Sequence, residues 1–165
     1  DIGVANDFRR IGLLRDPTNF GTSTVATATT RRQIYAAVFS SVSGTFTADE
    51  EINQASTGAV GKVIEYDSTN KILYYYQTRF PDVGTDSNGN LTAFSGANAI
   101  TGQSSSASAT PNTSNSTTTN GVSFSSGYSN PELAYDSGDI IYVEERSPIT
   151  RASDQTENVK LIIEF

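Results

Sequence analysis

The chain of 165 residues contains no cysteine, histidine, tryptophan or methionine. Without cysteine and histidine it cannot form a disulfide scaffold, a thiolate or imidazole metal centre, or a Ser-His-Asp triad. Carboxylate chemistry, hard-cation sites and a Lys or Tyr base are the options that remain. We therefore expect no cofactor.

Positive charge is also scarce, because 11 Lys and Arg residues stand against 18 Asp and Glu residues and give a net charge of −7. Nucleic acid binding normally needs a basic surface, so neither nucleic acid nor an anionic membrane is an expected partner. No run of 18 apolar residues is present, which argues against membrane insertion. The chain begins at Asp1 rather than Met, and we expect it to be a piece of a longer protein.

What the chain does contain is a set of short runs rich in β-branched and aromatic residues. Residues 60–66 and 71–77 flank four turn formers at 67–70 and predict a β-hairpin. Further strands are predicted at residues 11–14, 34–39, 139–145 and 159–165. No segment has the apolar stripe of a helix of ten residues or more. We predict a mainly β fold of antiparallel β-sandwich and hairpin architecture, with long Ser/Thr-rich loops and little helix, confined to 49–54 or 131–135.

A faint repeat with a period of 48 residues surrounds the predicted hairpin. Its positions are Phe46, Ile52, Ser56 and Ala59, which recur as Phe94, Ile100, Ser104 and Ala107. Two small β units would produce this pattern, and so would chance similarity in a chain rich in Ser and Ala. Both explanations stay open.

Residues 103–126 consist largely of Ser, Thr, Asn and Ala. A segment of this composition buries too little apolar surface to offset the entropy lost on ordering. We expect a long solvated loop, or an extended arm that pairs only against a partner.

No group of residues predicts catalysis or metal binding. The acidic clusters 49–51 and 144–145 lack the convergent geometry of an acid and base pair, because neighbours on one strand point to opposite faces. We expect both clusters to be solvated surface. The segment 86–90 has the composition of a calcium loop but not its distal Glu, so it is interpreted as a turn. The protein is not expected to be an enzyme.

The aromatic run 74–76 has two interpretations. In a strand, Tyr74 and Tyr76 share one face and Tyr75 takes the other, so one side is expected to be core. The exposed rings would then be ordinary sheet surface, or a face that binds a host glycan or surface protein.

The C-terminal residues carry a family resemblance. Residues 137–149 hold a Ser-Gly turn, an Ile-Tyr strand and a Glu-x-Arg-x-Pro-Ile turn, and an Asp-Gln-Thr-Glu segment at 154–157 leads to a strand ending on Phe165. This string resembles the end of gene product eight, the baseplate wedge protein of T-even-type contractile-tail phages. Residues 1–18 are similar to the family's segment just upstream. The resemblance covers 1–18 and 133–165, whereas the middle departs from the family pattern.

The resemblance implies a domain organisation and a role. Residues 1–30 and 129–165 would be frame strands, 31–102 an inserted β-hairpin module, and 103–128 a Ser/Thr-rich loop or arm. The family implies a structural, non-enzymatic subunit of the virion's tail baseplate, assembled in the host cytoplasm. Its expected partners are other baseplate wedge proteins and a second copy of itself in a homodimer. The alternative is a module on a phage tail protein that binds a host-surface glycan or protein.

Six polar residues near the C-terminus are candidates for an interface. They are Arg146, Arg151, Asp154, Gln155, Thr156 and Glu157. Both arginines could pair with carboxylates across a subunit contact, or brace their own turn.

Overall fold

The computed structural model describes residues 10–27, 29, 32–77, 91–134 and 137–145. These residues form eleven β-strands and no helix, and all strand pairs are antiparallel. The prediction of a mainly β, antiparallel fold is thereby confirmed. Residues 51–54 are a strand where a short helix was considered. The strand predicted at 159–165 lies outside the described residues.

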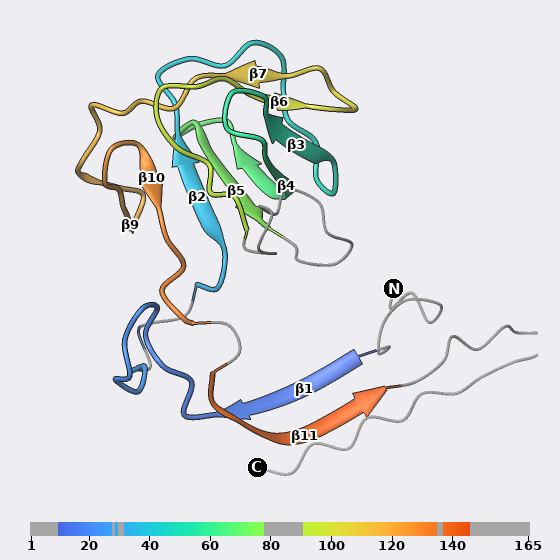
Figure 1. The fold of residues 1–165 in the computed structure, drawn as a ribbon, viewed down its shortest axis with the longest axis vertical. Helices are drawn as coiled ribbons and strands as arrows, with labels where there is room; N and C mark the ends of the chain where they lie inside the picture. Colours follow the sequence, from blue (N-terminus) through green and yellow to red (C-terminus); the bar gives the residue numbers. More distant parts are fainter. Residues whose placement is uncertain (1–9, 28, 30–31, 78–90, 135–136, 146–165) are drawn as a thin grey trace, which may run out of the picture. The chain divides into compact units, whose positions relative to one another are not determined.

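The chain divides into two compact units (Figure 1). The terminal unit comprises residues 1–17 and 137–165, and the central unit comprises residues 18–136. Residues 18–30 and 129–136 fall in the central unit, and the expected division into a frame, an insertion and a loop stays a prediction. In the terminal unit, β1 (Arg10–Arg15) pairs with β11 (Asp139–Glu145). Both strands were predicted from the sequence, but their pairing was not.

The central unit contains a seven-stranded sheet in the order β10-β2-β5-β4-β3-β6-β7. Its strands are β2 (Tyr35–Val38), β3 (Glu51–Gln54), β4 (Ala59–Asp67), β5 (Ile72–Tyr76), β6 (Ile100–Gly102), β7 (Ser108–Ala109) and β10 (Tyr128–Ser129). The predicted hairpin is the pair β4–β5. In its turn, the Asp67 carboxylate accepts hydrogen bonds from the backbone N–H groups of Thr69 and Asn70, at 2.9 and 3.0 Å.

This sheet closes on itself. Ser43, beyond the end of β2, exchanges two backbone hydrogen bonds of 2.9 Å with Ser108 of β7. Phe39 forms a further bridge with Pro111. The strands therefore form a small barrel, since the segment that continues β2 pairs with the segment that contains β7. Twelve buried residues fill it: Ala37, Phe39, Phe46, Ile52, Ala59, Val63, Leu73, Tyr75, Phe94, Ile100, Ala107 and Ala109.

The outer face of the sheet is covered by the hairpin of β8 (Thr118–Thr119) and β9 (Val122–Ser123). Val122 and Phe124 pack there with Ala36, Val38 and Ile72. The hairpin turns at Asn120 and Gly121, whose φ angles of 48° and 76° suit a two-residue turn. The stretch 103–126 is thus neither a solvated loop nor a free arm within this unit. Its few apolar residues suffice because each one meets an existing sheet.

The central unit begins and ends at one place. The segments 18–20 and 132–134 run antiparallel through the bridge between Asn19 and Leu133. The N–H of Ala134 donates to the carbonyl of Thr18 at 2.9 Å, and the N–H of Phe20 donates to the carbonyl of Glu132 at 2.8 Å. The two ends of the unit are therefore hydrogen-bonded neighbours.

The 48-residue repeat corresponds to two equivalent hairpins. In β3–β4, Asn53 pairs with Val60, and in β6–β7 the equivalent Thr101 pairs with Ser108, so both hairpins have one register. Both turns place a residue at positive φ, Gly58 at 75° and Ser106 at 57°. The repeated Phe, Ile and Ala residues all lie in the barrel core. The structure favours two β units over chance similarity.

A local two-fold axis relates the two hairpins. Asn53 and Thr101 occupy the same position of the repeat, and they pair with each other where β3 meets β6. Antiparallel strands that pair at equivalent positions are related by a two-fold rotation. The strand order β4-β3-β6-β7 is symmetric about this pair.

The buried side chains of Gln54 and Glu50 each accept a hydrogen bond from a hydroxyl group in the turn of one hairpin. In the first turn, the Thr57 hydroxyl donates to Gln54 Oε1 at 2.8 Å and accepts from the Ala59 N–H. In the second, the Ser105 hydroxyl donates to Glu50 Oε1 at 2.8 Å and accepts from the Ala107 N–H. Gln54 belongs to the hairpin whose turn it holds. Glu50, by contrast, belongs to the first hairpin but holds the turn of the second one.

Glycine at position 102 explains this difference. Gly102 is the repeat equivalent of Gln54, and a Cβ at Gly102 would lie 2.6 Å from both Glu50 Oε2 and Ser105 Oγ. The carboxylate of Glu50 therefore occupies the space that a side chain at position 102 would need.

Glu50 is 5% exposed, so the expectation that the whole 49–51 cluster is solvated was wrong for this residue. Its carboxylate accepts four hydrogen bonds, from the N–H groups of Thr47, Ser104 and Ser105 and from the Ser105 hydroxyl. Burial by itself would raise the pKa of Glu50, but these donors outweigh it and lower the pKa below its usual value. Four donors match the acceptor capacity of an ionised carboxylate.

Replacing Glu50 with Gln should lower the free energy of unfolding by about 2 kcal/mol at pH 7, because an amide cannot accept all four hydrogen bonds. The lowered pKa means that the carboxylate stabilises the fold above its unfolded pKa of about 4.3 and that this contribution is lost at lower pH. Urea unfolding followed by circular dichroism should show a constant difference between the two proteins above about pH 5 that shrinks below about pH 4. A difference independent of pH would contradict this role.

Replacing Gly102 with Ala should destabilise the protein by about 1–3 kcal/mol through overpacking against Glu50. Gly12→Ala is the matched control, because Gly12 also lies in a strand and a Cβ there meets only one atom, at 4.0 Å.

Combining Glu50→Ala with Gly102→Gln should be less destabilising than the two single changes added together, since the introduced amide would take the place that Gln54 has in the first turn. If the changes in the free energy of unfolding were simply additive, the two hairpin turns would not be equivalent.

Candidate functional site

The terminal unit presents large, exposed apolar side chains. β1 and β11 form a two-stranded ribbon, and six large side chains on it are between 47% and 68% exposed. They are Leu13, Leu14, Ile140, Ile141, Tyr142 and Val143. Because successive side chains of a strand alternate between faces, both faces of the ribbon carry apolar surface. We call these six residues the apolar ribbon.

The register of this ribbon is fixed at the end where β1 stops and β11 starts. The Arg15 guanidinium donates to the Asp139 carboxylate at 2.8 Å across the paired strands. Both side chains are exposed, so this ion pair contributes little to stability. Gly138 has a φ of +83°, and a Cβ there would lie 2.7 Å from the Arg15 carbonyl oxygen. Only glycine fits this turn, which is the Ser-Gly step noted in the sequence.

The sequence predicted strands at 11–14 and 139–145, and the structure has strands there. No described side chain of the terminal unit is buried. A ribbon of two strands has two faces, and no further strand of the terminal unit's described residues pairs with it or covers it. The continuous apolar run 140–143 was the available signal, since an unalternating run is typical of a strand covered on both sides.

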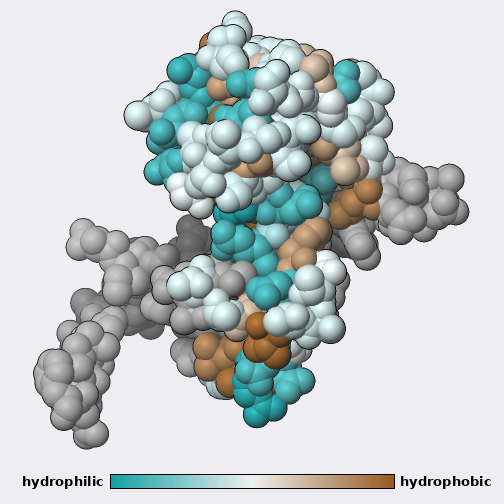
Figure 2. Space-filling view, turned by 90° about the vertical axis from the view of Figure 1, so that its left-hand side faces the viewer, coloured by the Kyte–Doolittle hydropathy of each residue, from teal (hydrophilic) through white to brown (hydrophobic). Residues whose placement is uncertain are grey.

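By contrast, the central unit has a mostly polar surface in the view of Figure 2, where it forms the upper, largely white and teal part. Its large apolar side chains are mostly buried in the barrel and under the β8–β9 hairpin. Ile64 on β4 is an exception, with 42% exposure. The apolar ribbon is therefore the more apolar of the two described surfaces.

The predicted aromatic candidates lie in the central sheet. Tyr75 is 2% exposed and packs against Phe94 and Tyr35 in the barrel, as expected for one side of the strand. Tyr74 is half-buried on the outer face, where it packs with the β8–β9 hairpin, and Tyr76 is half-buried as well. Burial raises the pKa of Tyr74, and the nearby Asp67 adds to that shift. A role of Tyr74 and Tyr76 in surface binding stays a prediction.

The six polar candidates Arg146, Arg151, Asp154, Gln155, Thr156 and Glu157 lie outside the described residues. Glu144 and Glu145 belong to β11, where their backbones pair with Ile11 and Arg10. Within the part of the chain that the structure describes, no group of three or more acidic residues could hold a metal ion. The same residues include no helix long and apolar enough to cross a membrane.

Comparison with known proteins defines a class of structural phage baseplate proteins. The family model described as Bacteriophage T4, Gp8 matches residues 70–165, which is more than half of the chain. The chain belongs to this family, whose namesake is a subunit of the baseplate wedge. No curated protein and no solved structure gave a significant match.

The matched range differs from the range of the resemblance seen in the sequence. It includes β11 and the C-terminal string, as expected, but also residues 70–132, where the family pattern was not recognised. It leaves out residues 1–18. The match therefore runs through β5 to β10 of the central unit as well as through one strand of the ribbon.

Proposed function

We propose that this protein is a structural component of a phage tail baseplate wedge that acts through protein–protein contacts, and that the apolar ribbon makes one of them. The observation that carries the proposal is the exposure of six large apolar side chains on the two strands of the ribbon. Membership of the wedge family supports it, because a wedge subunit works by assembly with other baseplate proteins.

The physical argument concerns the ribbon's stability. An isolated two-stranded ribbon is marginal in water, and contiguous exposed apolar surface typically marks an interaction site. A partner that packs on the ribbon would bury side chains such as Ile140 and Val143, which are 68% and 64% exposed. A few well-buried anchors of this kind carry most of the binding energy in protein interfaces.

The partner that we assign to the ribbon is another baseplate wedge protein. A second copy of the chain is the competing occupant, since a homodimer was also expected from the family resemblance. The central unit, with its own closed barrel and core, would be a self-contained module. The proposal includes the expectation that residues 31–102 are a module inserted into the family's frame.

The double change Ile140→Thr and Val143→Thr tests the assignment. Threonine keeps the preference for a strand, and both positions are exposed, so the free energy of unfolding should change by no more than about 0.5 kcal/mol per site. Binding to the other wedge proteins, measured by co-sedimentation and calorimetry, should weaken by about tenfold or more. Ile64→Thr removes an exposed isoleucine from the central unit and should bind normally.

Undiminished binding by the double variant, or equal loss in Ile64→Thr, would contradict the assignment. Sedimentation equilibrium of the unaltered chain alone separates the two occupants. Dimerisation abolished by the same double change, with wedge binding intact, would assign the ribbon to self-association instead.

A further inference from the structure

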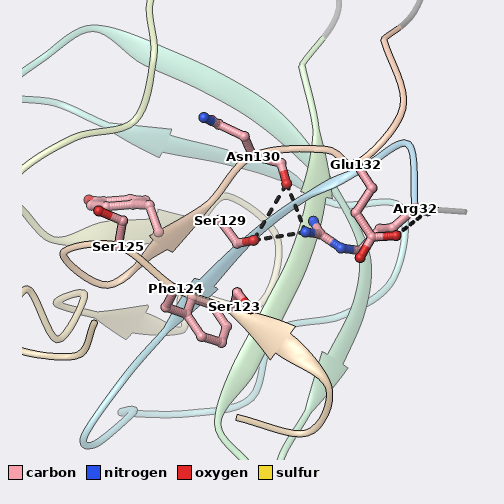
Figure 3. Close-up of a pocket in the computed structure, with 8 residues that line it drawn as sticks. Arg32, Ser123, Phe124, Ser125, Ser129, Asn130 and Glu132 are labelled. Carbon is pink, nitrogen blue, oxygen red and sulfur yellow. Dashed lines mark hydrogen bonds between the residues drawn. The ribbon is translucent and has the colours of Figure 1, made fainter. Parts of the chain in front are cut away.

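A pocket of about 620 Å³ opens on the central unit (Figure 3). Its lining comes from a residue shortly before β2, from the end of β9, and from β10 with the residues that follow it. The polar residues of this lining are Arg32, Ser123, Ser125, Ser129, Asn130 and Glu132. The volume falls within the range of pockets that take small ligands.

Arg32 organises one wall of the pocket. Its Nη2 group donates to the Ser129 hydroxyl and to the Asn130 carbonyl, both at 2.7 Å, as Figure 3 shows. Its Nη1 group donates to the Ile34 carbonyl. The wall is therefore fixed by contacts between residues almost a hundred positions apart in the chain.

One donor of this guanidinium remains unused. Arg32 Nε is buried and has no hydrogen-bond partner among the described residues. Buried donors in folded proteins almost always have partners, so an unpaired one calls for an explanation. The atom is closed off from solvent, so the groups open to a ligand are the hydroxyl and amide side chains of the rest of the lining.

The charges of the lining are balanced. The lining holds one guanidinium, that of Arg32, and one carboxylate, that of Glu132. Glu132 Oε2 accepts a hydrogen bond from the backbone N–H of Arg32 at 3.1 Å. A phosphate or other anion would meet the Glu132 carboxylate, and a cation would meet the guanidinium. A neutral ligand with many hydroxyl groups avoids both costs. It can also pair with hydroxyl and amide groups such as those of Ser125 and Asn130, each of which donates and accepts.

Aromatic rings supply the apolar part of the lining and hold it rigid. Phe124 is 5% exposed and packs against the outer face of the sheet. Tyr128 is anchored by its hydroxyl, which donates to the Gly96 carbonyl at 2.8 Å and accepts from Gln54 Nε2 at 3.2 Å. Ser125 and Tyr128 also exchange backbone hydrogen bonds of 2.8 and 3.1 Å. A pocket fixed in this way loses little entropy when a ligand binds.

We propose that this pocket binds a neutral saccharide, whose hydroxyl groups meet the polar wall and whose C–H faces meet the aromatic edges. This activity goes beyond assembly of the wedge, and it assigns saccharide recognition to the pocket rather than to the face of Tyr74 and Tyr76.

The test uses the full chain on an array of neutral hexose and hexosamine oligosaccharides, with sialylated and phosphorylated oligosaccharides as anionic comparators. A neutral saccharide should bind, and titration calorimetry on that compound should give a Kd of about 1 mM or tighter. Asn130→Ala, which removes the side-chain amide but keeps the carbonyl that Arg32 contacts, should weaken binding about tenfold. Ser125→Trp should abolish it by filling the pocket.

Ser41→Trp is the matched control, because Ser41 is exposed and is not part of the pocket lining, and it should bind like the unaltered chain. Thermal unfolding of each variant separates loss of binding from loss of fold. The proposal is overturned by an absence of binding to any neutral saccharide at about 10 mM, ten times the expected Kd, by preference for the anionic compounds, or by full binding in Ser125→Trp. Loss of binding in Tyr74→Phe with unchanged binding in Ser125→Trp would move the site to the tyrosine face.

Discussion

A charged group can be buried only when its surroundings replace the water that it loses, and the barrel of this protein is arranged around one such group. The carboxylate of Glu50 accepts four hydrogen bonds, which join the start of one hairpin to the turn of the other. Gln54 makes a second such link, since its Oε1 accepts from the N–H of Ser95 and the hydroxyl of Thr57. These two side chains therefore join the two hairpins by hydrogen bonds, in addition to the contacts of the apolar core.

Local patterns predicted several strands of this fold. The β-branched runs and the four-residue turn predicted the β4–β5 hairpin, and similar runs predicted β1, β2 and β11. Closure of the barrel could not be predicted, because Ser43 and Ser108 have no strand preference and pair only when the rest of the sheet has brought them together. Burial of Glu50 was equally hidden, since two of its donors are backbone groups more than fifty residues away.

The candidate sites were predictable to different degrees. The run from Ile140 to Val143 predicted a strand, but a single sequence says nothing about which molecule covers its apolar side chains. Arg32 gave no signal at all, because its partners are a serine hydroxyl and backbone carbonyls, which occur everywhere in a chain. Family membership, by contrast, was visible in a short C-terminal string whose residues lie outside the strands of the central unit.

The pairing of segments 18–20 and 132–134 has a mechanical consequence. Because the two ends of the central unit are joined by hydrogen bonds such as that between Ala134 and Thr18, a pull on the segments that enter and leave this unit loads these bonds before those of the barrel. Force that enters at residue 18 passes directly to residue 134 through these hydrogen bonds. The barrel strands bear tension only after the segments 18–20 and 132–134 have separated. A particle that strains its subunits can thus stretch the terminal strands while the module stays folded and its pocket keeps its shape.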